Sequence, residues 1–365
     1  MKSLLTRAWV EIDLGALLRN GARVADHTGV RLLPMIKGDA YGLGAVRVAR
    51  ALEQLDPWGF GVATIAEGQE LRDAGIERPI VVFTPLLPAD FDGARRARLT
   101  PALGERESIR CWRRTSLPWH LAIDTGMNRA GVPWNEIASL RDVIDATVEG
   151  VFTHFHSAQL NDGSRQVQED RFAEALADLR RRPSMVHAEN SPALARRRSD
   201  RGSGREQWTL ARPGIFLYGV GSGAGSEITP EPVVGVRARV VDIRDIAAGE
   251  TVSYDATYRA PGPRRIATLA IGYADGYRRA LSNLGTVLVR GHRTQVVGLV
   301  TMDMTMIDVT DVQCEIGDVA TLIGADGGEQ LDVATVAAAG GISPYELLTG
   351  LRSRLPRRFL DAGRD

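Results

Sequence analysis

Lysine is nearly absent from this chain. Among its 45 Lys plus Arg residues, only Lys2 and Lys37 are lysines. Arginine replaces lysine where a positive charge suffices, but a guanidinium stays protonated and cannot attack a carbonyl as an amine does. Lys37 follows an apolar run and precedes Gly38. The retained amine therefore indicates a nucleophile that forms a Schiff base, and chance survival on the surface is the alternative.

Other polar side chains follow short apolar runs, at Asp124, His154, Asn190 and Arg212. Segments with helical periodicity separate these runs, which is typical of parallel strands that are buried on both faces. Because the carboxyl ends of parallel barrel strands meet at one face, we expect these side chains to gather with Lys37. That face is where a barrel carries its chemistry.

The number of apolar runs decides between two α/β architectures. Eight strands followed by crossovers favour a (β/α)8 TIM-type barrel over an open sheet. The predicted strands are 31–37, 58–63, 79–84, 99–103, 120–124, 150–155, 185–190 and 208–212. The predicted helices are 45–54, 65–74, 88–98, 107–114, 135–146 and 166–181.

A Gly/Ser-rich segment at 221–226 marks a change of pattern. Beyond it the sequence is rich in β-branched residues with a period of two, which is typical of strands. The predicted strands are 233–243, 251–258, 265–271, 286–289, 294–300, 304–309 and 318–323, followed by helices at 333–339 and 345–351. We therefore expect a barrel domain at 1–225 and a mainly β domain at 226–365.

Composition excludes several classes of protein. The 365 residues carry a formal net charge of zero and no long basic run, so no nucleic-acid partner is expected. Two cysteines, Cys111 and Cys314, imply no disulfide framework. The chain has no apolar run long enough for a membrane span, and its first residues are too polar for a signal peptide. We expect a soluble cytoplasmic protein.

Nine short motifs, spread in order over almost the whole chain, resemble those of the alanine racemases. They are residues 37–42, 124–129, 153–155, 190–191, 212–219, 252–254, 272–276, 302–303 and 344–346. The resemblance implies a barrel that binds pyridoxal 5′-phosphate and a C-terminal β domain. It also implies an isomerase that interconverts L-alanine and D-alanine, and so supplies D-alanine for peptidoglycan.

The resemblance assigns two catalytic residues. Lys37 would hold the cofactor and act as one acid/base group, and Tyr254 would be the other, delivered by the partner subunit of a homodimer. Racemisation removes a proton from one face of a planar carbanion and returns one to the other, so a base on each face suits it. Without the resemblance, a strand tyrosine of the β domain is the favoured interpretation of Tyr254.

The remaining cofactor contacts also follow from the resemblance. The phosphate would meet the hydroxyls of Tyr41, Ser191 and Tyr345 and the backbone amides of Gly214 and Ile215. Such donors at the end of a strand suit a dianion.

Arg212 would face the pyridine nitrogen of the cofactor. Because a guanidinium cannot accept that proton, the nitrogen stays neutral and stabilises a carbanion weakly; a surface arginine is the alternative. His154 would lie beside the ring, His187 in the network behind it, and Asn190 at the cofactor. His154 and His156 lack further ligands for a metal, and no metal is expected.

The resemblance places Arg129 near the phenolic oxygen of the cofactor and the substrate carboxylate. The backbone amide of Met302 would also meet the carboxylate, and Tyr273 would line the entry corridor. Asp303 belongs to the same turn as Met302 and would be part of the substrate site; a surface turn is the alternative. Ala122 stands where many family members carry a lysine modified to a carbamate. Arg129 then needs another anion, which could be chloride, a nearby acid or the substrate.

Three other functions compete with an alanine racemase. A racemase of serine, lysine or arginine would share every motif, and Leu43 and Thr301 depart from the common pattern. A decarboxylase of the same architecture is disfavoured by Arg212. A non-catalytic cofactor-binding protein would lack the second domain and Tyr254.

Overall fold

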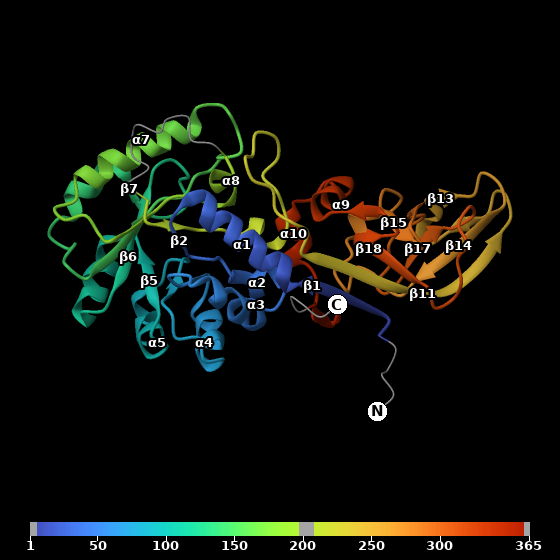
Figure 1. The fold of residues 1–365 in the computed structure, drawn as a ribbon, viewed down its shortest axis with the longest axis horizontal. Coiled ribbons are helices and arrows are strands. Elements are labelled where there is room, and N and C mark those ends of the chain that lie inside the picture. The colour runs from blue at the N-terminus through green and yellow to red at the C-terminus, as the bar shows by residue number, and fades with distance from the viewer. Residues whose placement is uncertain (1–5, 197–207, 361–365) are drawn as a thin grey trace.

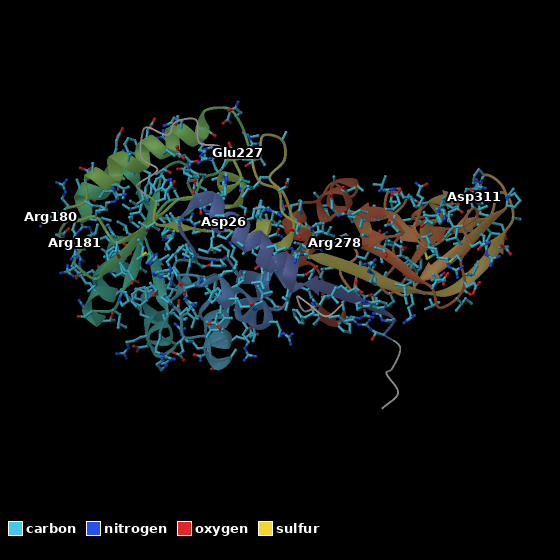
Figure 2. The ribbon with its side chains drawn as sticks, in the orientation of Figure 1. Asp26, Arg180, Arg181, Glu227, Arg278 and Asp311 are labelled. Carbon is cyan, nitrogen blue, oxygen red and sulfur yellow. The ribbon has the colours of Figure 1, made fainter. Side chains whose placement is uncertain are left out.

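The structure is a computed structural model that describes residues 6–196 and 208–360. It is elongated, with a lobe of alternating strands and helices at one end and a sheet lobe at the other (Figure 1). Charged side chains lie along the whole molecule, with Arg180 and Arg181 at one end and Asp311 at the other (Figure 2). No helix among the described residues has the length and apolar character that a membrane span needs.

Eight parallel strands form the first lobe, and the predicted barrel is confirmed. They are β2 (Arg31–Leu32), β3 (Phe60–Val62), β4 (Ile80–Val82), β5 (Thr100–Leu103), β6 (Trp119–Asp124), β8 (Val148–Phe152), β9 (Met185–His187) and β10 (Leu210–Ala211). Strands β3 to β9 pair in this order, and β10 pairs with β2. Backbone bonds close the ring, from Trp58 N–H to the Leu32 carbonyl and from Thr209 N–H to the Val186 carbonyl, both 2.8 Å.

Helices cover the outside of the barrel. They include α3 (Ala45–Leu52), α4 (Ile65–Asp73), α5 (Phe91–Arg96), α6 (Arg106–Trp112) and α7 (Ser164–Ala177). The helix predicted at 135–146 is wrong, because this segment forms a short 3-10 helix, η4 (Trp134–Leu140), next to the two-residue strand β7 (Val132–Pro133).

The helix α1 (Leu14–Thr28) was not predicted. Its glycines lower the intrinsic helix propensity of the segment. Tertiary packing explains Gly21, because a Cβ there would lie 2.4 Å from Leu55 Cδ1. The Asp13 carboxylate accepts from Ala16 N–H and caps the helix, which ends at Gly29 with φ +70°.

The second lobe is built on the long strand β11 (Val234–Ile246), and its predicted mainly β character is confirmed. The other strands of its main sheet include β14 (Arg264–Leu269), β15 (Thr286–Val289), β16 (His292–Gln295), β17 (Thr305–Asp308), β18 (Val319–Asp326) and β19 (Glu329–Leu331). The helices α9 (Val333–Ala339) and α10 (Pro344–Thr349) follow.

Both ends of the chain add strands to this second sheet. Strand β1 (Ala8–Asp13) pairs antiparallel with β11 and parallel with β20 (Arg357–Leu360). Residues 8–13 therefore belong to the sheet of the second lobe, although the predicted division counts them with the barrel.

The strand predicted at 251–258 is interrupted. Strands β12 (Thr251–Val252) and β13 (Tyr258–Arg259) form a hairpin around a 3-10 turn, η7 (Tyr254–Ala256). Positive φ angles at Ser253, Asp255 and Ala256 break the extended backbone. Tyr254 consequently lies on an exposed loop rather than on a strand.

Candidate active site

A cavity of about 510 Å³ opens at the carboxyl ends of the barrel strands. It brings together ten of the side chains and backbone positions that the sequence predicts for one site. These are Lys37, Tyr41, Arg129, His154, Asn190, Ser191, Arg212, Gly214, Ile215 and Tyr345. They come from strand ends all around the barrel and, through Tyr345 on α10, from the second lobe.

Lys37 begins a left-handed turn, α2 (Lys37–Gly42). Residues Gly38 to Tyr41 have φ angles between +52° and +63°, a conformation that costs a non-glycine residue roughly 1–2 kcal/mol. Bonds at both ends hold it: the Asp39 carboxylate accepts from Ala45 N–H at 2.7 Å, and Arg357 Nη2 donates to the Gly42 carbonyl at 2.8 Å. The turn lets Lys37 and Tyr41 reach the same cavity.

Gly42 is the position where this turn meets the second lobe. It has φ +86°, and a Cβ there would lie 2.7 Å from the Leu348 carbonyl oxygen. We expect Gly42→Ala to lower the free energy of unfolding by about 2–4 kcal/mol, since strain and overlap add. Urea unfolding measures this. Gly75→Ala is the matched control, with the same φ of +86° and nothing within 4 Å. Equal losses in both variants would contradict a role for the Leu348 contact.

The surroundings of Lys37 favour its neutral amine. Burial lowers the pKa of Lys37, and the positive charges of Arg129 and Arg212 lower it further, while Glu67 opposes them. A lysine with a lowered pKa has more of its nucleophilic form at neutral pH.

Arg212 is fixed deep in the barrel and is 3% exposed. Its Nη1 donates to the His187 carbonyl at 2.8 Å, and its Nη2 donates to the carbonyls of Thr153 and Ala188 at 2.8 and 3.0 Å. Burial lowers the pKa of Arg212 to about 9, so the guanidinium is still protonated at neutral pH. It can donate hydrogen bonds into the cavity but cannot accept one.

The two predicted histidines flank this guanidinium. His154 Nδ1 lies 3.3 Å from Arg212 Nη2, and His187 Nδ1 lies 2.6 Å from Nη1. Burial, followed by the charge of Arg212, lowers the pKa of His154 to about 3 and the pKa of His187 well below its usual value. Both rings are therefore neutral at physiological pH. His187 is not among the residues that line the cavity, and it contacts Arg212.

The cavity is also lined by three residues with hydroxyl groups, Tyr41, Ser191 and Tyr345. Ser191, the first residue of α8 (Ser191–Leu194), has its Oγ 2.8 Å from Gly214 N–H. The rings of Tyr41 and Tyr345 lie 6.1 Å apart, and burial raises the pKa of both phenols, which stay protonated donors. Gly214 leaves room for Tyr41, because a Cβ at Gly214 would lie 2.5 Å from Tyr41 Oη.

Four predicted residues lie outside this cavity, on the second lobe. Tyr254, Tyr273 and Met302 are 71%, 40% and 54% exposed, respectively. Tyr273 N–H donates to the Thr301 carbonyl, and Asp303 pairs with Arg354 at 2.7 Å. Within one chain, these four residues are therefore separate from the cavity that contains Lys37.

Comparisons with known proteins identify the family of the chain. The family descriptions "Alanine racemase, N-terminal domain" and "Alanine racemase, C-terminal domain" match residues 12–222 and 233–359. The chain belongs to the alanine racemase family.

Relatives and solved structures cover nearly the whole chain. An alanine racemase of Geobacter sp. (strain M21) is 36% identical over 96% of this chain and 97% of its own. The alanine racemase of Bacillus anthracis with bound L-Ala-P has a TM-score of 0.89 at 31% identity and covers 99% of this chain and 97% of its own. The alanine racemase of Bartonella henselae with covalently bound pyridoxal phosphate has a TM-score of 0.87 at 29% identity. It covers 97% of this chain and 99% of its own.

Ala122 leaves Arg129 without a neighbouring counter-charge in this member of the alanine racemase family. Both residues line the cavity. In residues 6–196 and 208–360, Arg129 forms no ion pair. The only acid close in sequence, Asp124, instead accepts from Gly126 N–H at 2.8 Å. Ala122 lines the cavity and packs in a small apolar cluster with Ala102 and Phe152.

Phe83 and Phe152 also line the cavity and were not predicted from the sequence. Their rings lie 5.9 and 5.3 Å from the Arg212 guanidinium carbon and pack edge-to-face on each other. The sequence shows only that both phenylalanines lie in predicted strands. Such a position does not distinguish a phenylalanine of the core from one that shields a cation. Within the described part of the chain, no group of three His, Cys, Asp or Glu side chains could hold a metal.

Proposed function

We propose that this protein is a pyridoxal-phosphate-dependent racemase that interconverts L-alanine and D-alanine. One observation carries the proposal: an amine with a lowered pKa, a buried guanidinium and a set of hydroxyl donors line a single cavity. Membership of the alanine racemase family supports the choice of substrate.

The residues present fit the phosphorylated cofactor. Tyr41, Tyr345 and Ser191 provide hydroxyls at one end of the cavity, together with the backbone at Gly214 and Ile215. Lys37 supplies the amine for the aldehyde carbon. Asn190 caps α8 by accepting from Ala193 N–H and so holds this end of the site in place. When bound, the cofactor supplies the electron sink that makes an α-proton removable.

Arg212 limits that electron sink. Its guanidinium would donate to the pyridine nitrogen and cannot give up a proton to it at neutral pH. A pyridine nitrogen that accepts from Arg212 would stay uncharged and would stabilise negative charge only weakly. We infer that Arg212 restricts side reactions such as transamination, and that His154 orients it from the cavity side.

Two groups would move the substrate's proton. Lys37 would serve one face, and Tyr254 of the partner subunit would serve the other. The exposure of Tyr254 and Met302, away from their own cavity, supports a homodimer in which each site is completed by its partner. We propose that this homodimer works in the cytoplasm. In the cell, such an enzyme would supply D-alanine for peptidoglycan.

The substrate carboxylate would meet Arg129 and the backbone amide of Met302, with Tyr273 and Asp303 along its approach. Because Arg129 forms no ion pair within residues 6–196 and 208–360, we propose that a chloride ion or ordered water lies between Arg129 and Ala122 when no substrate is bound. A crystal structure with apolar side chains in that space would contradict this.

The proposed function is tested by incubating the enzyme and pyridoxal phosphate with single L-amino acids, followed by chiral chromatography. We expect D-alanine to form faster than any other D-amino acid. Faster formation of D-serine, D-lysine or D-arginine would make the protein a racemase of that amino acid. Release of carbon dioxide without a D-product would indicate a decarboxylase.

A further inference from the structure

A second buried histidine lies behind the guanidinium that faces the cofactor site. His120, on β6, places its Nδ1 2.9 Å from His187 Nε2. Both imidazoles are 0% exposed, and the other nitrogen of His187 faces Arg212. His120 Nε2 lies 4.0 Å from Glu149 Oε2 and has no hydrogen-bond partner among the described residues.

The chemistry of the guanidinium sets the direction of this chain of contacts. Arg212 has only donors, so His187 Nδ1 must accept its hydrogen bond. A neutral His187 then carries its proton on Nε2 and donates to His120 Nδ1. His120 in turn carries its proton on Nε2, on the side of the Glu149 carboxylate. Along the contacts from Arg212 through His187 and His120 to Glu149, each N–H group therefore points toward Glu149.

Neighbouring side chains fix the positions of both imidazole rings, and burial keeps both rings neutral. The His187 ring stacks on Phe152 at 5.1 Å and 7°, and the Trp58 ring lies 5.5 Å from His120. At Gly150, a Cβ would lie 2.6 Å from three atoms of the His120 ring. Burial, then the charge of Arg212, lowers the pKa of His120 to about 3. The barrel thus reserves space for an imidazole at a position that an apolar side chain could fill.

We propose that His120 is a positioning residue that stabilises the His187 tautomer required by the Arg212 contact, by accepting from His187 Nε2–H, and that Glu149 keeps the His120 proton on Nε2. Without an acceptor at His120 Nδ1, His187 could place its proton on Nδ1. Two N–H groups would then oppose each other at the Arg212 contact, and the guanidinium would turn away from the cofactor nitrogen. This rests on the proposed role of Arg212.

The tautomers are observable, because the chain has only six histidines. In holoenzyme labelled with ¹⁵N-histidine, two-bond ¹H–¹⁵N spectra distinguish Nε2–H from Nδ1–H rings. We expect His120 and His187 to be Nε2–H tautomers that do not titrate between about pH 5 and 8. Spectra of the His120→Leu and His187→Gln variants provide the assignments.

Substitutions at His120 test the consequence. His120→Leu removes the acceptor, whereas His120→Asn keeps an oxygen near the Nδ1 position. We expect His120→Leu to give a mixture of His187 tautomers and to shift the absorption of the bound cofactor. Because a misplaced group slows the reaction, kcat should fall between about 10-fold and 100-fold, with little change in KM. His120→Asn should restore the spectrum and most of kcat. Exposed His292→Asn is the matched control.

Several outcomes would overturn the proposal. An Nδ1–H His187 in the unmodified holoenzyme refutes it without any variant, so a poorly folding His120→Leu does not leave it undecided. An unchanged cofactor spectrum in a folded His120→Leu also refutes it, as does failure of His120→Asn to restore what leucine removes. Absence of D-alanine formation would instead refute the proposed function, because the tautomer measurement does not depend on turnover.

Discussion

Replacing Lys37 by alanine should lower D-alanine formation at least about 10⁴-fold, the largest effect we expect from any single substitution. The change removes both the covalent anchor of the cofactor and one of the two proton-transfer groups. Chiral chromatography gives the rate. The absorption spectrum of the dialysed protein shows in parallel whether a covalent cofactor remains, and we expect that it does not.

Lys37→Arg separates the two properties of the lysine. It keeps the positive charge but lacks a nucleophilic amine, and it imitates the bias toward arginine of the whole chain. We expect it to be as inactive as Lys37→Ala. Substantial activity in the arginine variant would mean that Lys37 acts only as a charge, and that the Schiff base is wrongly placed.

A hybrid dimer that combines Lys37→Ala with Tyr254→Phe should recover activity that neither variant has alone. If each cavity is completed by the partner's loop, one site of the hybrid contains both Lys37 and Tyr254 and the other contains neither. Doubly tagged hybrids, purified after co-expression through two affinity tags in sequence, should therefore show about half of the wild-type rate per dimer.

The controls for this experiment are the two single-variant homodimers, which carry the same tags and should stay inactive. Hybrids that are isolated yet inactive would show that Tyr254 does not act across the interface. Failure to isolate any doubly tagged protein, when both chains are expressed and folded, would contradict the homodimer itself.

The sequence pattern predicted those parts of the fold that depend on residues close together in the chain. The buried barrel strands are short apolar runs, and the segments between them carry helical periodicity, so their order could be deduced. Helix α1 was missed because its glycines weaken a local signal that packing against Leu55 outweighs. Strand β1 was missed because its partners lie at residues 234–238 and 357–360.

The residues of the candidate site likewise fall into those that the sequence predicts and those that only the fold brings together. Lys37, Ser191 and Arg212 stand in motifs that follow barrel strands, where a barrel gathers them, whereas Tyr345 comes from α10 of the second lobe. The left-handed backbone from Gly38 to Tyr41 was not predictable, since Asp39, Ala40 and Tyr41 rarely adopt it. His120 and Glu149 could be linked to Arg212 only after the closed barrel had placed β6, β8 and β10 around one core.

The pairing of β1 has a consequence for the time course of synthesis. Ala8 opposes Ala238, so the ribosome makes about 230 residues between the two partners, a delay of roughly 10–50 s. During that interval an apolar strand, whose Val10 and Ile12 end fully buried, has no sheet to join. Its parallel neighbour β20 is made later still. Strand β1 therefore emerges long before either of its partners, and any delay in translation prolongs its exposure to other chains.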